Sequence, residues 1–466
     1  MRLETEVERR GRSSVQKDAR HVLHPWADLS SVGAENSLIV REAHGVEVVD
    51  HRGRRYLDAI GGMWCVTVGY GREELIDAMQ AQARMMPYYT PFGDVTNEPA
   101  TELAALLAEL SPGDLNRVHF TTGGSTAVES AIRIAHLYYG SQGRPEKHHV
   151  LSRVDAYHGS TYLAASLSGK DADRTSFHYE STWVHHLQSP RYDPDHSPVS
   201  AAERLSELIG EMEAAIAGIG AENIACFIAE PILASGGVLT PPPGYHAATA
   251  EVCRRNDILY ISDEIVTGFG RLGHFFASEV KFGVVPDMIV TAKGLTSGYQ
   301  PLGAVLISDR VAAALVEAAD PAKPVFSNGF TYSGHPVACA TAIANIEVMK
   351  GDDICGHVRG VGPYFVERLR ELRTSPIVYT VRGDHLMACV ECQVPGEVGP
   401  TPRNMALAAR VDAYCEEAGL LVRPYENLCI MSPPLIITKG EIDRIAAIMA
   451  DALARAEREL NARESG

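Results

Sequence analysis

The sequence has no excess of basic residues, which is the usual mark of a surface that binds nucleic acid or anionic lipid. Its 42 Lys and Arg residues are outnumbered by 59 Asp and Glu residues, so the 466-residue chain has a formal net charge of −17 at pH 7. The basic residues also form no long run. These features argue against nucleic acid and membrane surfaces as partners and favour small-molecule ligands.

Long apolar runs are absent as well. The longest apolar-looking stretch, residues 224–239, is interrupted by Glu230 and Pro231, whereas a membrane span needs about 18 uninterrupted apolar residues. The N-terminal residues lack the apolar centre of a signal peptide, and Glu4, Glu6 and Glu8 disagree with an acid-poor transit peptide. We therefore predict a soluble chain located in the cytoplasm.

Cysteines are few and do not suggest disulfides. The nine cysteines are an odd number and are scattered along the chain, which is typical of reduced thiols in a reducing compartment. Cys389 and Cys392 form one CxxC pair, but a zinc site needs a second pair or histidines at ligand spacing. The surrounding HLMACVEC alternates like a strand. The sequence therefore predicts no metal site.

The middle of the chain alternates between short β-type runs and helical runs. Strands that alternate with helices are typical of a mostly parallel, doubly wound α/β sheet. Two helices, over 73–85 and 98–110, precede this region. We expect strands at 118–121, 149–152, 224–229, 258–262, 288–292 and 304–307, and helices at 126–139, 202–219 and 245–255.

This pattern suggests three parts. Residues 1–72 form an N-terminal segment with a hairpin, residues 73–334 form a large domain around the central sheet, and residues 335–466 form a smaller α+β domain that ends in a long helix. A hairpin on its own is too small to be stable. We therefore expect the N-terminal segment to pack with the small domain.

Three polar residues stand where three apolar runs end. Glu230 follows IACFIA, Asp263 follows ILYIS and Lys293 follows MIVTA. In open α/β sheets, ligands bind in the crevice beyond the carboxyl ends of the strands. We therefore expect these side chains to converge on one site.

Lys293 has an unusual setting for a lysine, because most lysines are solvated surface charges. The segment AKGLTSGYQPLGA around it is small, turn-rich and almost uncharged. Such an environment lowers the pKa of an amine and makes it nucleophilic toward a carbonyl. The setting indicates a lysine that forms a Schiff base.

A possible phosphate site lies at TTGGST, residues 121–126, between an expected strand and an expected helix. Backbone N–H groups and the helix dipole at such a position favour a phosphate dianion, although a GGS bend is more often simple capping. The Walker lysine is missing, which argues against a nucleoside triphosphate.

A phosphate anchor, a carbonyl-seeking lysine and an acid that pairs with a protonated ring nitrogen are together what pyridoxal phosphate requires from a protein. Asp263 would keep the pyridine nitrogen protonated, so that the ring accepts the electron pair released when a proton leaves the substrate carbon. We therefore predict pyridoxal 5'-phosphate as the cofactor.

Several ordered motifs carry a resemblance to a known family. GGSTAVESA, YHGST, YISDEIVTGFGRLG, the Lys293 segment and FTYSGHP together resemble the class III, omega-amino-acid type of aminotransferase. The resemblance implies a fold-type-I α/β architecture and a homodimer, with a tetramer as the alternative. It also implies transfer of an amino group from a primary amine or omega-amino acid to a keto acid, with pyruvate as the first choice.

The resemblance further implies roles for individual residues. Lys293 would form the internal aldimine with the cofactor and then shuttle the proton, while Asp263 would hold the ring nitrogen. Thr331 would reach the phosphate in the neighbouring subunit. The remaining expected cofactor contacts are Gly124, Ser125, Tyr157 stacked on the ring, His158 beside it, Glu230 and Ile265.

Substrate contacts are implied at Trp64, Phe92 and Arg423. Trp64 occupies the place of a pocket tryptophan in pyruvate-using omega-transaminases, although an aromatic core residue is a competing interpretation. Arg423 matches the family's mobile arginine, which grips a carboxylate in a planar, two-point manner and swings aside for an amine that has none.

Three positions depart from related branches of the family. Val266 and Ser235 stand where the ornithine and 4-aminobutyrate branch has Gln and Glu. That Glu neutralises the arginine in the ornithine enzyme, so with Ser235 in its place we expect Arg423 to move, as in the pyruvate-dependent enzymes. Thr126 replaces a usual Glu, and the sequence offers no explanation for this change.

Two alternative functions stay open. GFGRLG, residues 268–273, fits the GxGxxG of nicotinamide-dependent dehydrogenases, but it neither follows its strand directly nor opens an expected helix. Racemases, mutases and decarboxylases share this fold and the lysine. The amine donor is also open, because taurine, β-alanine, a diamine or an aryl-alkyl amine would each fit.

Overall fold

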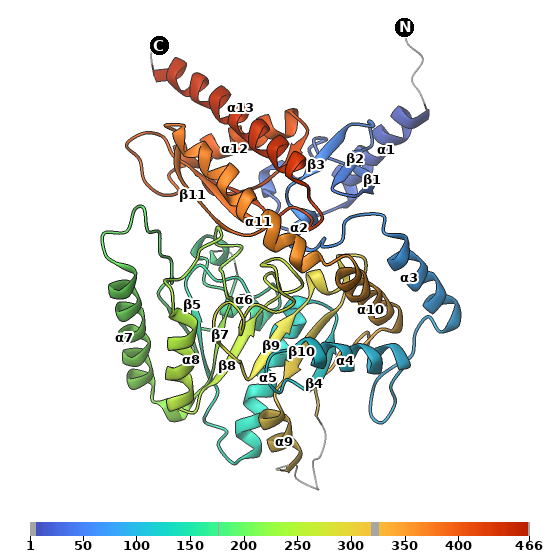
Figure 1. Cartoon of the computed structure of the whole chain (residues 1–466), viewed down its shortest axis with the longest axis vertical. Helices are drawn as coiled ribbons and strands as arrows, with labels where there is room; N and C mark the ends of the chain where they lie inside the picture. The colour runs from blue at the N-terminus through green and yellow to red at the C-terminus, as the bar shows by residue number, and fades with distance from the viewer. Residues whose placement is uncertain (1–5, 176, 318–325, 465–466) are drawn as a thin grey trace.

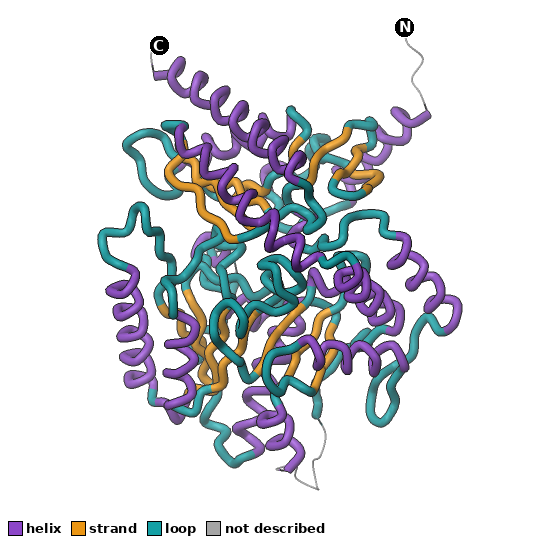
Figure 2. The backbone as a smooth tube through the Cα atoms, viewed as in Figure 1, coloured by secondary structure: helices purple, strands orange, loops and turns teal. Residues whose placement is uncertain are grey.

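The structure is a computed structural model that describes residues 6–175, 177–317 and 326–464. Figure 1 shows a lower body built around a central sheet and an upper body that holds both ends of the chain. Figure 2 shows that strands occur in both bodies and that helices cover them. None of the described helices is long and apolar enough to cross a membrane.

The central sheet has seven strands, which are mostly parallel as predicted. Only β10 (Gly303–Ile307) runs antiparallel to both of its neighbours. The other strands are β4 (Arg117–Thr121), β5 (His149–Arg153), β6 (Val184–Leu187), β7 (Ile224–Ala229), β8 (Leu259–Asp263) and β9 (Met288–Thr291). Their order across the sheet is β4-β10-β9-β8-β7-β5-β6.

Helices cover both faces of this sheet because successive strand residues point to opposite sides. Leu259 and Ile261 of β8 belong to the same buried cluster as residues of α5, whereas Tyr260 between them packs with residues of α7 and α8. The first face carries α5 (Gly124–Ser141), α6 (Tyr162–Leu167) and α9 (Asp309–Glu317), and the second carries α7 (Ala201–Ile219), α8 (Tyr245–Arg255), α4 (Glu98–Leu110) and α10 (Pro336–Gly351).

The upper body contains two small sheets. One has the order β1-β2-β3-β13, in which the N-terminal hairpin pairs with a strand from the C-terminal part through Leu57 and Leu420. Its strands are β1 (Val40–His44), β2 (Glu47–Asp50), β3 (Arg55–Asp58) and β13 (Leu420–Leu421). The other, in the order β11-β12-β15-β14, consists of β11 (Val378–Asp384), β12 (Met387–Cys392), β15 (Leu428–Met431) and β14 (Arg423–Tyr425).

The remaining helices connect or cover these sheets. They are α1 (Glu6–His21), α2 (Gly61–Trp64), α3 (Glu73–Met85), α11 (Ile354–Arg370), α12 (Pro402–Glu417) and α13 (Lys439–Glu464).

The predicted domain boundaries at 72/73 and 334/335 stay predictions. Helix α10, which follows the second boundary, lies against α3 and α4 of the lower body.

Candidate active site

The three polar residues predicted to converge arrive at one edge of the central sheet. Strand β8 pairs in parallel with β7 through Ser262 and Ala229, so Glu230 is level with Asp263. Asp263 in turn pairs with a residue of β9, and Lys293 follows that strand. Lys293 begins the short 3₁₀ turn η4 (Lys293–Thr296), which we call the Lys293 turn.

Asp263 belongs to a buried hydrogen-bond network. His158 Nδ1 lies 2.6 Å from Asp263 Oδ2, and both side chains are buried. The neighbouring Tyr157 donates its backbone N–H to Glu230 Oε1 at 2.9 Å, and Glu230 Oε2 accepts the N–H of Ala234 at 3.2 Å. Burial raises the pKa of Glu230; His158 opposes this rise and Asp263 adds to it. Glu230 therefore fixes the loop that carries Tyr157 and His158.

The Lys293 amine has no hydrogen-bond or ion-pair partner among the described residues. Burial lowers its pKa, while Cys65, Asp263 and Glu230 oppose part of this effect. A lower pKa increases the neutral fraction of an amine, which is the nucleophilic and proton-accepting form. The backbone of Lys293 has a φ of 41°, a left-handed conformation that costs a residue other than glycine roughly 1–3 kcal/mol.

The strained Lys293 turn is held from the side by a fully buried amide. Asn345, on α10, donates through Nδ2 to the carbonyls of Gly294 at 2.9 Å and Leu295 at 3.1 Å. Its Oδ1 accepts a hydrogen bond from the hydroxyl of Thr67 at 3.3 Å. Two hydrogen bonds thus hold the turn that carries Lys293, and the third ties the same amide to Thr67.

The predicted phosphate site is the first turn of α5. It lies close to the loop that carries Tyr157 and His158. Gly123 precedes this helix and provides no side-chain cap, so the first backbone N–H groups are available to a ligand. Ser125 Oγ accepts the N–H of Ser160 at 3.0 Å. A Cβ atom on Gly124 would lie 2.9 Å from the side chain of Ile265, so Ile265 packs directly on this turn.

Arg423 lies against Ser235, the residue that replaces glutamate in the related branch. Its Nη1 and Nη2 atoms are 3.5 and 3.4 Å from Ser235 Oγ. No carboxylate forms an ion pair with Arg423 in the part of the chain that the structure describes. Burial lowers the pKa of this guanidinium. Arg423 is also close enough to lower the pKa of Lys293.

Three expected site residues show no contact with Glu230, Asp263 or Lys293 within one chain. Trp64 is 3% exposed and packs in an apolar cluster. Phe92 is exposed and lies next to Gly329 in a cavity of about 1070 Å³, whose lining includes Thr126 of the first turn of α5 but neither Lys293 nor Asp263. Thr331 is exposed, and its carbonyl accepts the hydroxyl of Tyr88 at 2.7 Å. The cofactor and substrate roles of these residues stay predictions.

The groups at the sheet edge fit pyridoxal phosphate. The Lys293 amine, the buried Nε2 atom of His158 and the first N–H groups of α5 all lack a partner among the described residues. A carbonyl-seeking amine, an acid for a ring nitrogen and an N–H cradle for a phosphate are the groups that this cofactor needs.

Two buried residues near this site were not predicted from the sequence. Asn345 interrupts the apolar run AIANIEVM, which was a usable signal, because a buried amide needs partners. Lys170 is 4% exposed and lies 3.3 Å from Ser235 Oγ, but nothing in LSGKDAD indicates its burial. Thr126, unexplained from sequence, donates its hydroxyl to the carbonyl of Gly123 at 2.8 Å and so shapes the turn before α5.

Comparison with known proteins decides the family. The family model of class-III aminotransferases matches residues 29–453. The chain belongs to the class-III aminotransferases. One relative of this aminotransferase, the putrescine–pyruvate aminotransferase of Pseudomonas aeruginosa, is 36% identical over 436 residues, which cover 92% of this chain and 93% of the relative.

Solved structures agree with this assignment. An (S)-enantioselective omega-transaminase from Thermomicrobium roseum matches with a TM-score of 0.91 and 38% identity, over 95% of this chain and 98% of that one. An amine transaminase from an uncultivated Pseudomonas species, solved in its PLP-bound form, matches with a TM-score of 0.88 and 33% identity, over 94% and 99% of the two chains.

These matches confirm the predicted family, fold type, cofactor and reaction class. The enzyme is a pyridoxal-phosphate-dependent aminotransferase of fold type I that moves amino groups from amines to keto acids. The dehydrogenase alternative also disagrees with the structure, because residues 268–273 form turns after β8 and open no helix.

Proposed function

We propose that this aminotransferase uses pyruvate as acceptor and a primary amine or omega-amino acid as donor. The observation that carries the proposal is the contact between Arg423 and Ser235, in which a partly buried guanidinium is held by a hydroxyl at 3.4–3.5 Å in place of a carboxylate. Such an arginine can grip the carboxylate of a keto acid. It can also move away for a donor without one, because only two long hydrogen bonds hold it. Pyruvate is named in the P. aeruginosa relative, which supports this acceptor.

The same proposal assigns a role to each residue at the sheet edge. Pyridoxal phosphate, when bound, supplies an aldehyde for the amino group and a ring that accepts an electron pair. Lys293 Nζ takes the proton from the substrate carbon, and Asp263 pairs with the ring nitrogen. Glu230 keeps the Tyr157–Ser160 loop in place. Gly124 and Ser125 would hold the phosphate, Ile265 would pack beside the cofactor and Tyr157 would stack on its ring, while His158 would orient Asp263, which it contacts at 2.6 Å.

The same proposal has the enzyme act as a homodimer in the cytoplasm. The face around the cavity of about 1070 Å³ exposes large apolar side chains, including Phe92 and Phe326. A second copy that covers this face would remove these side chains from water and bring Thr331 toward the partner's cofactor. All nine cysteines are free, which supports a reducing compartment. Light scattering of the purified protein distinguishes a dimer from a tetramer.

A donor screen tests the proposed reaction. Amines are offered with either pyruvate or 2-oxoglutarate, and the alanine or glutamate formed is quantified. The proposal requires alanine as the main product and ping-pong kinetics, while Lys293→Ala should bind the cofactor without turnover. Glutamate as the main product would overturn the choice of acceptor. Near-normal turnover in Lys293→Ala would overturn the role of the lysine.

A further inference from the structure

Two cationic side chains, Lys170 and Arg423, point at one hydroxyl, that of Ser235. Lys170 Nζ lies 3.3 Å from Ser235 Oγ, and the guanidinium of Arg423 lies 3.4 Å from the same atom. A serine oxygen has two lone pairs and can accept from both donors. Because the hydroxyl is neutral, it compensates neither charge. An anion near the Ser235 hydroxyl would therefore meet the guanidinium of Arg423 and the ammonium of Lys170, which already has Asp173 as a counter-ion at 2.9 Å.

Lys170 is held firmly in this place. Its side chain is 4% exposed, its ammonium forms an ion pair with Asp173 at 2.9 Å, and it lies 3.8 Å from the centre of the Tyr425 ring. The ring of Tyr157, next to the cofactor residues, is also within 5.7 Å. A cation over an aromatic face is stabilised without losing its charge. Lys170 is thus held in one position beside Ser235, where burial lowers the pKa of its ammonium and Asp173 opposes this effect.

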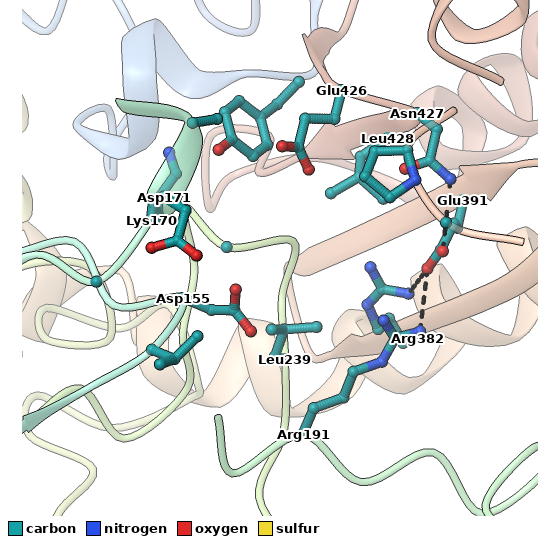
Figure 3. Close-up of a pocket in the computed structure, with 17 residues that line it drawn as sticks. Asp155, Lys170, Asp171, Arg191, Leu239, Arg382, Glu391, Glu426, Asn427 and Leu428 are labelled. Carbon is teal, nitrogen blue, oxygen red and sulfur yellow. Dashed lines mark hydrogen bonds and ion pairs between the residues drawn. The ribbon is translucent and has the colours of Figure 1, made fainter. Parts of the chain in front are cut away.

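Three carboxylates besides Asp173 line a cavity that Lys170 also borders. This cavity of about 270 Å³ is lined by Lys170 together with Asp155, Asp171 and Glu426, and Figure 3 shows the three carboxylates pointing into it. The opposite wall holds Arg191 and Arg382, which share Glu391 (Figure 3). Lys170 therefore borders this cavity and also contacts Ser235, the residue on which Arg423 rests.

We propose that Lys170 is a specificity-determining residue, which with Arg423 makes the enzyme favour substrates that carry an anionic group at the end remote from the reacting amine. Carboxylates and sulfonates fit this description, and diamines do not. The inference rests on the proposed function, since it concerns the substrates of the same site. It differs from the substrate named in the P. aeruginosa relative, whose donor putrescine is a diamine.

Three donors of similar length isolate this effect. 4-Aminobutyrate, butylamine and putrescine present a carboxylate, a methyl group and an ammonium group at the far end of the same kind of chain. The wild-type enzyme should use them in that order of kcat/KM with pyruvate. In Lys170→Met, the value for 4-aminobutyrate relative to butylamine should fall by about tenfold to a hundredfold, as expected for one lost charged hydrogen bond. The value for putrescine relative to butylamine should rise.

A second variant reverses the expected direction. Asp173→Asn removes the direct counter-ion of Lys170, so the preference for 4-aminobutyrate over butylamine should increase. Lys281→Met serves as the matched control, because Lys281 forms a similar ion pair with Asp384 at 2.8 Å and makes no contact with Ser235. The relative values for the three donors should stay unchanged in this control.

Binding of butyrate gives a readout that is independent of turnover. The butyrate concentration that half-maximally protects the cofactor-free protein against thermal unfolding should rise in Lys170→Met by a factor similar to that in kcat/KM. An equal change for all three donors in Lys170→Met, or unchanged butyrate binding, would overturn the proposal. If the wild-type protein formed no alanine from any donor, the proposed function would fail, and the butyrate measurement would still decide the role of Lys170.

Discussion

Replacing Asn345 with leucine removes the side chain that ties α10 to the Lys293 turn. Asn345 is fully buried, and its amide makes three hydrogen bonds, to Gly294, Leu295 and Thr67. Leucine has a similar volume but no polar atom, so the change removes the hydrogen bonds with little change in packing. The variant therefore isolates the contribution of the amide.

The cost follows from the groups that lose their partners. Gly294 keeps a hydrogen bond from the N–H of Ser297 at 3.2 Å, whereas the Leu295 carbonyl and the Thr67 hydroxyl have no second partner among the described hydrogen bonds. A buried polar group left unsatisfied costs about 1–3 kcal/mol. The two groups together should therefore lower the free energy of unfolding by about 2–6 kcal/mol. Release of the turn should also let Lys293 leave its strained left-handed conformation.

Thermal unfolding of the cofactor-free protein measures the loss of stability. The rate at which the cofactor becomes attached, trapped with borohydride, measures the release of the Lys293 turn. Thr341→Val is the matched control, because Thr341 is a buried residue of the same helix whose hydroxyl bonds only the carbonyl of Val337 at 2.7 Å. Asn345→Leu should melt several degrees below this control and attach the cofactor more slowly. Equal melting temperatures and equal attachment rates in the two variants would show that the Asn345 amide does not hold the Lys293 turn.

Three further predictions concern single side chains. Asp263→Asn should lower kcat by roughly 10²–10³, the usual effect of losing one preorganised electrostatic group, as measured by single-turnover absorbance; a loss below tenfold would contradict its role. Arg423→Ala should lower kcat/KM for pyruvate by about tenfold or more and affect an amine donor without a carboxylate much less, which steady-state kinetics can compare. Burial, helped by Glu416, raises the pKa of Asp412 to about 7 from 3.8, so the folded protein holds a proton that the unfolded chain releases and stability falls between about pH 4 and pH 7. Asp412→Asn should therefore gain stability over wild type across this range, as seen in melts near pH 4 and pH 8; an equal gain at both pH values would argue against titration of Asp412.

Local sequence signals predicted the elements with clear boundaries. Helix α4 begins and ends as predicted, because its periodic pattern stops at Ser111-Pro112-Gly113. The convergence of Glu230, Asp263 and Lys293 was also predictable, since the carboxyl ends of neighbouring parallel strands meet at one sheet edge. Reactive side chains that directly follow buried parallel strands can thus be assigned to one site from the sequence alone.

Features that depend on packing between distant segments were not predictable. Strand β6 has the sequence VHHL, in which two adjacent histidines replace the alternation of apolar and polar residues that predicts a strand. The antiparallel direction of β10 depends on the path of the chain between strands, which the residues of that strand do not encode. Likewise, Lys170 and Asn345 acquire their importance only when Ser235 and the Lys293 turn are brought beside them. The burial of Trp64 also depends on strands of the upper body.

The proposed mechanism requires that one lysine at the edge of the central sheet carries the cofactor. Reduction of the protein–cofactor complex with borohydride, followed by peptide mass spectrometry, tests it most directly. We expect the phosphopyridoxyl group on Lys293 and none on Lys147 or Lys170, which are the most buried lysines of the described chain. A label on either of these lysines, or an unchanged amount of label in Lys293→Ala, would contradict the account.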